Sequence, residues 1–120
     1  MAIPKMEVNL KELDELFKRI EGLDKETKEK LTDEIFYTAL FIESDAKKSC
    51  PVVTGRLRSS IRALFSREPI SAVIGTPVEY AELVEYGSRE LNRRAKPYLY
   101  PAYFKNIAKL KETLENAIGR

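Results

Sequence analysis

The stretch from Cys50 to Ile61, CPVVTGRLRSSI, constrains the fold of this chain more than any other. A helical apolar pattern precedes it and an alternating apolar pattern follows it. Pro51 cannot continue a helix, and Gly55 can adopt a positive φ without steric cost. The sequence therefore predicts a corner built on Pro51, Thr54 and Gly55, at which a helix gives way to a strand.

Length and composition indicate one water-soluble domain covering residues 1–120. No apolar run approaches the length of a membrane span, so we expect no membrane contact. The first residues lack the apolar core of a signal peptide. Cys50 is the only cysteine, which excludes an internal disulfide and is consistent with a reducing compartment.

Two helices are predicted before the corner. The first occupies the N-terminal segment 1–22, with Asn9 as its cap and Glu12 three residues later, and we expect it at the periphery. The second runs over about 24–48 with apolar residues at helical spacing. Phe36 and Leu40 widen its apolar face, so we expect this helix to be covered on two sides.

After the corner, alternation over 60–66 and 70–75 predicts a hairpin. The next segment, TPVEYAELVEYG, predicts a short helix over about 77–86, with Thr76 as cap, Glu79 closing a capping box and Gly87 past its end. At 100° per residue its three glutamates share one polar face, opposite an apolar one. These are Glu79, Glu82 and Glu85.

Residues 88–96 lack periodicity and core residues, and we expect a mobile basic loop whose ends pair weakly. Pro97 marks a further turn, and an edge strand is predicted near 96–99. A C-terminal helix over about 101–118 carries an apolar stripe that includes Phe104. The predicted fold class is α+β, a small antiparallel sheet packed by the long, the short and the C-terminal helix.

Charge is banded along the chain. Residues 50–70 carry four bases and one acid, and 88–96 again four and one, so each band has a net charge of +3. Residues 71–87 between them carry three glutamates and no base, giving −3. Such bands suit a self-complementary or nucleic-acid-facing protein, and a mixed solvated surface is the alternative.

The amino-acid composition argues against most kinds of enzymatic catalysis. There is no histidine, which removes the commonest general base and metal ligand. Cys50 could react beside Arg56, but a buried cysteine at a helix end is the simpler interpretation. The three glutamates of 77–86 fit solvent or a basic partner better than a cation. We therefore expect no catalytic residue, metal, cofactor or small-molecule substrate.

Nucleic-acid binding has some support from two groups of arginines followed by tyrosines at 98, 100 and 103. The overall isoelectric point of about 8.6 is modest for a dedicated binder. The arginines are Arg56, Arg58 and Arg62 in the first group and Arg89, Arg93 and Arg94 in the second.

Three segments in this order resemble one family: CPVVTGRLRSSI, VIGTPVEYAELVEYGS and KPYLYPAYF. They are similar to the small phage neck and tail-completion proteins named after the tenth gene product of a lambdoid coliphage. The resemblance covers roughly residues 35–110. The family usually has aspartate where this chain has Val53, and ends its short helix in glutamate-phenylalanine-glycine-threonine where this chain has Glu85-Tyr86-Gly87-Ser88. Its last segment more often reads proline-phenylalanine-leucine-arginine-proline-alanine.

The resemblance implies a non-enzymatic virion protein of the head-to-tail joint, present in the host cytoplasm during assembly. It implies a homo-oligomeric ring between head-closure and tail proteins, with an isolated subunit that can be monomeric. We hypothesise that one arginine group meets the glutamate face of the adjacent subunit, while the other contacts DNA in the channel without reading its sequence. The alternative is a small nucleic-acid-binding or toxin-like host protein.

Overall fold

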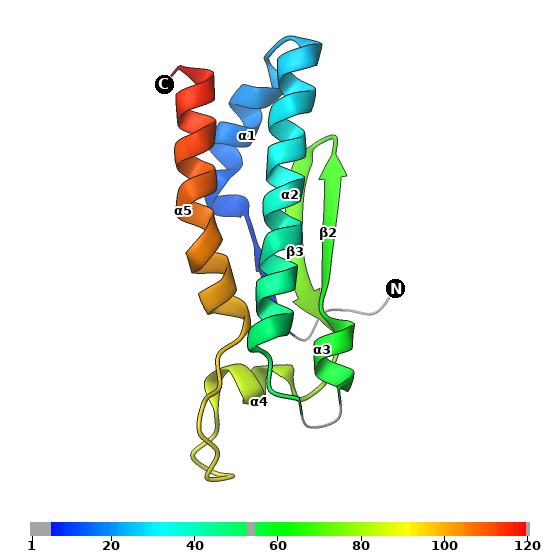
Figure 1. Cartoon of the computed structure of the whole chain (residues 1–120), viewed down its shortest axis with the longest axis vertical. Coiled ribbons are helices and arrows are strands. Elements are labelled where there is room, and N and C mark those ends of the chain that lie inside the picture. The colour runs from blue at the N-terminus through cyan, green and yellow to red at the C-terminus, as the bar shows by residue number, and fades with distance from the viewer. Residues whose placement is uncertain (1–5, 53–54, 120) are drawn as a thin grey trace.

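The computed structural model describes residues 6–52 and 55–119. The body is elongated, 52 × 28 × 21 Å, with long helices over a small sheet (Figure 1). In chain order the elements are β1 (Met6–Asn9), the 3₁₀ helix η1 (Lys11–Leu13), α1 (Asp14–Glu21), α2 (Lys25–Ser49), α3 (Arg56–Ser60), β2 (Arg62–Arg67), β3 (Ile70–Thr76), α4 (Ala81–Tyr86) and α5 (Leu99–Ile118).

The sheet is antiparallel, in the order β1-β3-β2. Along β3, Ile70, Ala72 and Ile74 are buried toward the helices, whereas Ser71 on the other face is exposed. Within the described residues, the helices therefore form a second layer over one face of the sheet. This α+β arrangement confirms the predicted fold class.

Helix α2 confirms the predicted long helix. The Asp24 carboxylate accepts a hydrogen bond from the backbone N–H of Thr27, which satisfies one free donor of the first turn. Ile35, Ala39 and Ile42 face the core and are fully buried. The helix packs on both the sheet and α5, and it ends at Ser49 before the predicted break.

The predicted hairpin is confirmed as β2 and β3, joined by a tight turn at Glu68 and Pro69. Its start differs from the prediction, because residues Arg56–Ser60 form the short helix α3 and β2 begins only at Arg62. Period-2 alternation could not distinguish one helical turn from the first residues of a strand.

The N-terminal prediction was wrong in part. Residues Met6–Asn9 form the strand β1, and the Asn9 side chain accepts a hydrogen bond from Lys11 N–H at 3.1 Å instead of capping a helix with Glu12. A four-residue strand is too short to be recognised by its alternation. The segment expected at the periphery supplies core residues: Leu13, Leu16, Phe17 and Ile20 are all buried.

The C-terminal helix was predicted correctly, but two details were wrong. The described residues near 96–99 form no strand, and Tyr98 lies directly before the first residue of α5. Phe104 is 64% exposed, while its neighbour Tyr103 is buried and donates its hydroxyl to Glu12. Tyr103 lies one turn before the buried Ile107, so it belongs to the inward stripe.

Candidate functional site

The structure describes two of the three residues expected at the corner after α2. Cys50 is buried, Pro51 is half-buried, and Gly55 has φ of +80°, directly before α3. Thr54 lies outside the described residues. Gly55 thus provides the left-handed backbone that the change of direction requires.

Two arginines after the corner bind its backbone. Arg58 Nη2 donates to the Cys50 carbonyl at 3.0 Å, which ties α3 to the end of α2. Arg62 Nη1 donates to the carbonyls of Ser59 and Ile61, at 2.6 and 2.9 Å. Arg58 is half-buried and binds within the subunit. Arg62 is exposed, and its two hydrogen bonds use only one of its nitrogens, so the other donors of its guanidinium can reach a partner.

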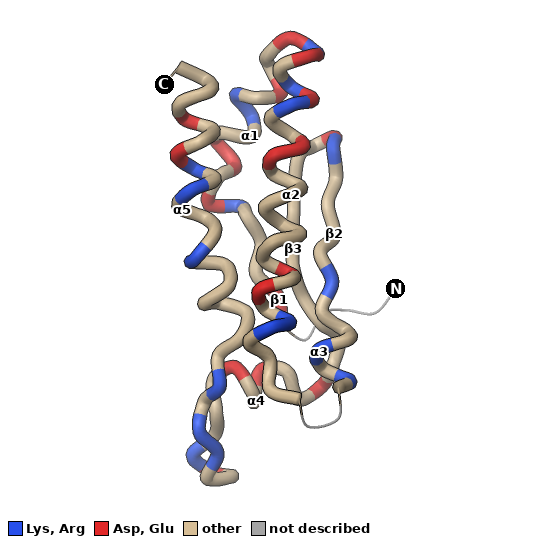
Figure 2. The backbone as a smooth tube through the Cα atoms, in the orientation of Figure 1, with Lys and Arg blue, Asp and Glu red and all other residues tan. Residues whose placement is uncertain are grey.

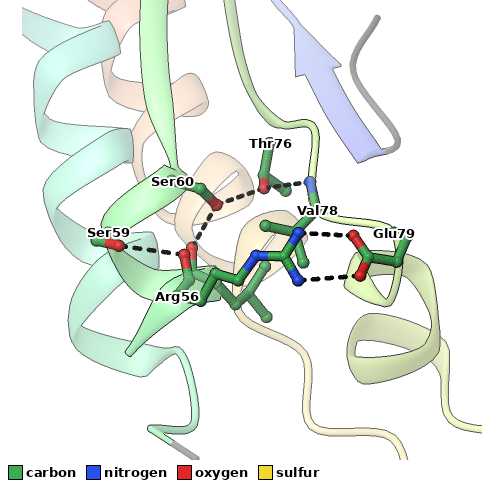
Figure 3. Close-up of polar contacts among 7 residues, drawn as sticks. Arg56, Ser59, Ser60, Thr76, Val78 and Glu79 are labelled. Atoms are coloured by element: carbon green, nitrogen blue, oxygen red, sulfur yellow. Dashed lines mark hydrogen bonds and ion pairs between the residues drawn. The ribbon is translucent and has the colours of Figure 1, made fainter. Parts of the chain in front are cut away.

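Arg56 is committed as well. Its Nη1 and Nη2 donate to the two carboxylate oxygens of Glu79, each at 2.9 Å (Figure 3). Its guanidinium lies 5.9 Å from the ring centre of Tyr80. The carboxylate raises the pKa of the guanidinium further, so Arg56 stays charged. A contact that we expected between subunits thus exists within one.

The predicted capping box at Thr76 was wrong. Helix α4 begins only at Ala81, without a side-chain cap. Thr76 ends β3, buried, with its hydroxyl 2.6 Å from Ser60 Oγ and accepting a hydrogen bond from Val78 N–H at 3.1 Å (Figure 3). The local sequence matched a helix cap, but the side chain is used to join α3 to the end of β3.

Glu85 corrects the predicted acidic face. Its side chain is buried, 2% exposed, and Oε1 accepts hydrogen bonds from the backbone N–H groups of Tyr98 and Leu99 at 3.1 and 2.9 Å. Oε2 accepts a third from Tyr100 N–H at 3.3 Å. Glu85 thus caps the first turn of α5 from another helix. Of the three predicted glutamates, Glu79 forms an ion pair with Arg56, and Glu82 is exposed on α4.

One backbone pair lies within the basic loop of residues 88–96. Ser88 and Arg93 exchange two backbone hydrogen bonds at 3.0 and 2.8 Å. Gly87 begins this loop with φ of +74°, and a Cβ there would lie 2.6 Å from Ala95 N, so the crossing of the two arms requires glycine. Pro97 is exposed at the far end of the loop.

The loop forms the basic end of the molecule (Figure 2). Arg89, Arg93 and Arg94 are exposed and line a shallow hollow of about 490 Å³ with Tyr86. Guanidinium groups around an aromatic ring can bind carboxylates, phosphates or a stacked base. The structure therefore brings the second arginine group together, whereas Arg56 and Arg58 of the first group form hydrogen bonds within the subunit.

Little in the described residues suggests covalent chemistry. Burial is the main cause that raises the pKa of the Cys50 thiol, so its reactive thiolate is disfavoured despite nearby Arg58. No cluster of three potential metal ligands occurs among residues 6–52 and 55–119. In the same residues, no helix has the length and apolar character of a membrane span. The arrangement can bind charged partners.

Comparison with known proteins gives one family. The family described as "Bacteriophage HK97-gp10, putative tail-component" matches residues 14–87, well over half of the chain. This range contains α1 to α4 and thus the corner, the hairpin and Glu85. No curated protein and no solved structure matches the chain.

Proposed function

We propose, from the premise that this chain belongs to the HK97-gp10-like family of bacteriophage tail components, that it is a structural protein of the head-to-tail joint. In this role it has no enzymatic activity and acts as one layer of the neck or completed tail. The family match is the observation that carries the proposal. It is supported by Glu85, Thr76 and Arg58, whose side chains form hydrogen bonds within the subunit that serve the fold.

The subunits assemble as a closed ring in the virion. Each subunit of a ring uses two different surfaces, one for each neighbour. Of the charged residues expected at these surfaces, Arg56, Arg58, Glu79 and Glu85 have contacts within the subunit. Of this set, Arg62 and Glu82 are the exposed charges left for neighbours, and the basic loop is left for DNA.

The basic loop faces DNA in the channel of the ring. The loop lies at one end of the long axis, clear of the helical body (Figure 2). Its residues Arg89, Arg93 and Arg94 are exposed. Their contacts are made with phosphates and hence carry no sequence preference. Filter binding of the purified protein to duplex DNA should show an affinity that falls steeply with salt, and replacement of the three arginines by glutamine should abolish it. Equal binding by this variant would contradict the loop's role.

The direct test of the joint is inactivation of the gene in the phage that encodes it. We expect electron microscopy of the lysate to show separate filled heads and tails, and a plasmid copy to restore joined particles. Protease digestion and mass spectrometry should detect the chain in purified virions. Normal joined particles without the chain would contradict the proposed function.

A second candidate is a small nucleic-acid-binding or toxin-like host protein. The cluster of Tyr86 with three arginines is the observation that favours it. This candidate predicts binding that depends on sequence, or arrest of host growth on expression, in the absence of any virion gene. The genes beside it distinguish the two, because portal, capsid and tail genes are expected only for the virion protein.

A further inference from the structure

Both outer edges of the sheet are open in the part of the chain that the structure describes. β2 forms one edge and β1 the other, and no further strand pairs with either. An open edge presents unpaired N–H and C=O groups to another chain. An edge-to-edge contact is therefore available on both sides of each subunit.

The direction of the free backbone groups follows from the ladder. Leu10 N–H donates to the Ala72 carbonyl, so the backbone groups of Ala72 point toward the β1 side. Its partner Phe65 must then point its N–H and C=O out of the β2 edge. Ala63 points the same way, and its N–H donates to Glu43 Oε1 at 2.6 Å.

The same alternation applies to β1. Val8 pairs with Ile74, whose backbone groups also point toward β1, so the groups of Glu7 and Asn9 point out of the β1 edge. The β1 edge thus offers free groups at two residues. These two residues are separated by one residue along β1, which is the same spacing as between the two residues of β2 whose backbone groups point outward.

Charges on the two edges are complementary. Arg62 of β2 and Glu7 of β1 both pair with Gly75, so they stand at one level on the face that the helices leave uncovered. Both side chains are exposed. Within a subunit they are two strands apart, about 10 Å. Across two adjoining edges they would be neighbours, and opposite charges on neighbouring strands stabilise a sheet.

Apolar side chains lie beside both edges in the helical layer. On the β2 side, Phe65 stacks on Phe36 with ring centres 4.3 Å apart, and Leu40 follows one turn along α2; Phe65 and Leu40 are each 43% exposed. On the β1 side, Tyr100 borders a groove with β1, and the ring of exposed Phe104 lies 6.0 Å from it. These patches lie at opposite edges of the sheet.

We propose that the partner of each open edge is a second copy of this chain, with β2 of one subunit paired to β1 of the next. This inference rests on the proposed ring and names its interface. Because β1 and β2 are both antiparallel to β3, and a ring repeats each subunit by rotation, the new pair is parallel. The sheet then continues around the ring.

One register satisfies both charges and hydrogen bonds. With Arg62 opposite Glu7 of the neighbour, the Ala63 carbonyl accepts the N–H of the neighbour's Asn9, and Phe65 N–H donates to the carbonyl of that Asn9. The Ala63 N–H keeps its bond to Glu43. The patch of Leu40 and Phe65 meets the Tyr100 and Phe104 side of the neighbour, which removes apolar surface from water.

Cysteine cross-linking tests this contact in the phage that encodes the chain. Glu7→Cys and Arg62→Cys replace exposed residues, and native Cys50 stays because it is buried. The two new cysteines of one subunit are too far apart for a disulfide, which requires Cα atoms within about 7 Å. Any bond between them therefore joins two subunits. The double variant should give a ladder of covalent multimers in purified particles, and particles with a mixture of the two single variants should give dimers only.

Three outcomes separate the possibilities. Multimers from Arg62→Cys alone would indicate a symmetric β2–β2 contact and overturn the proposal. A chain present in joined particles without Glu7–Arg62 cross-links would overturn this inference and leave the proposed function standing. A chain absent from the particles would overturn the proposed function itself. As a matched control, Glu7→Cys with Ser44→Cys, an exposed residue of α2, should give no ladder.

Charge reversal provides an independent measurement. Arg62→Glu alone and Glu7→Arg alone should each reduce the yield of joined particles at least tenfold, because like charges then meet across the edge. The combined variant restores opposite charges and should recover most of the yield. Circular dichroism should show that each variant is folded. Single variants with full yield, or a combined variant without recovery, would contradict the contact.

Discussion

The carboxylate of Glu85, in α4, accepts the backbone N–H of Leu99, the first residue of α5, at 2.9 Å. Free N–H groups at the start of a helix are usually satisfied within the same segment. Here a buried side chain from 14 residues earlier does so. The contact fixes where α5 starts relative to α4 and closes the basic loop between them.

Replacement of Glu85 should therefore destabilise the subunit. Glu85→Ala leaves three N–H groups in or near the core without an acceptor, and we expect a loss of about 3 kcal/mol in the free energy of unfolding measured with urea. Glu85→Gln retains one carbonyl oxygen and should lose less. Glu82→Ala, on the exposed face of the same helix, serves as control and should be near neutral. Equal stability of Glu85→Ala and Glu82→Ala would contradict the capping role.

Arg56 and Glu79 should behave as an intramolecular pair. Arg56→Glu and Glu79→Arg should each lower the melting temperature slightly, since both side chains are largely exposed and their attraction is screened. The combined variant reverses both charges and should recover most of the loss. Ring assembly should be unaffected by the combined variant. Additive losses in the double-mutant cycle would show that the two residues do not interact.

Sequence patterns predicted the elements with local causes. Helix α2 has a capping aspartate, a regular apolar period and a proline beyond its end, and each is visible in neighbouring residues. Strand β1 and the role of Glu85 depend on distant partners: Glu7 pairs with Gly75, 68 residues away, and Glu85 binds Leu99, 14 residues away. No spacing within a helix or strand reveals such contacts. A helical wheel placed Glu85 with Glu82 because it uses only the spacing within one helix and does not include contacts with α5.

Among the charged residues, too, local features could be predicted and long-range contacts could not. The basic loop could be predicted from its composition, and it is exposed as expected. The first arginine group could not be interpreted, because Arg58 binds a carbonyl of the corner and Arg56 binds Glu79 through folding of distant segments. Charge banding along a sequence thus detects surfaces and intramolecular pairs alike. The complementary level of Arg62 and Glu7 became visible only through the register of β3.

Buried tyrosines should make the subunit sensitive to alkali. Tyr98 is fully buried and donates to the Ala81 carbonyl, and burial raises the pKa of its phenol well above 10. Burial, with the nearby Glu12 carboxylate, also raises the pKa of Tyr103. A raised pKa in the folded state means that the stabilisation is complete below pH 10, where both states are protonated, and is lost as pH rises above it.

We expect the free energy of unfolding to be level up to about pH 10 and to fall above it. In the Tyr103→Phe variant, the free energy of unfolding should fall less steeply with pH, because unfolding then releases up to about one proton fewer per molecule. Tyr37→Phe, at an exposed position of α2, should keep the original slope. Urea titrations at closely spaced pH values measure this. An unchanged slope for Tyr103→Phe would contradict the assignment.

Gly75 should be needed for the attachment of β1. A Cβ at this position would lie 2.8 Å from the Met6 carbonyl oxygen and 2.9 Å from Glu7 Cβ, closer than real contacts allow. Gly75→Ala must therefore push β1 away from β3, at a cost of about 1–3 kcal/mol. Hydrogen exchange should show faster exchange of the Val8 amide, with the α2 amides unchanged. Gly22→Ala is the matched control, since its Cβ would meet only Arg19 O at an ordinary 3.6 Å.

If β1 forms the subunit interface, Gly75→Ala should also abolish the Glu7–Arg62 cross-link, whereas Gly22→Ala should retain it. A retained cross-link in Gly75→Ala would show that β1 is not displaced.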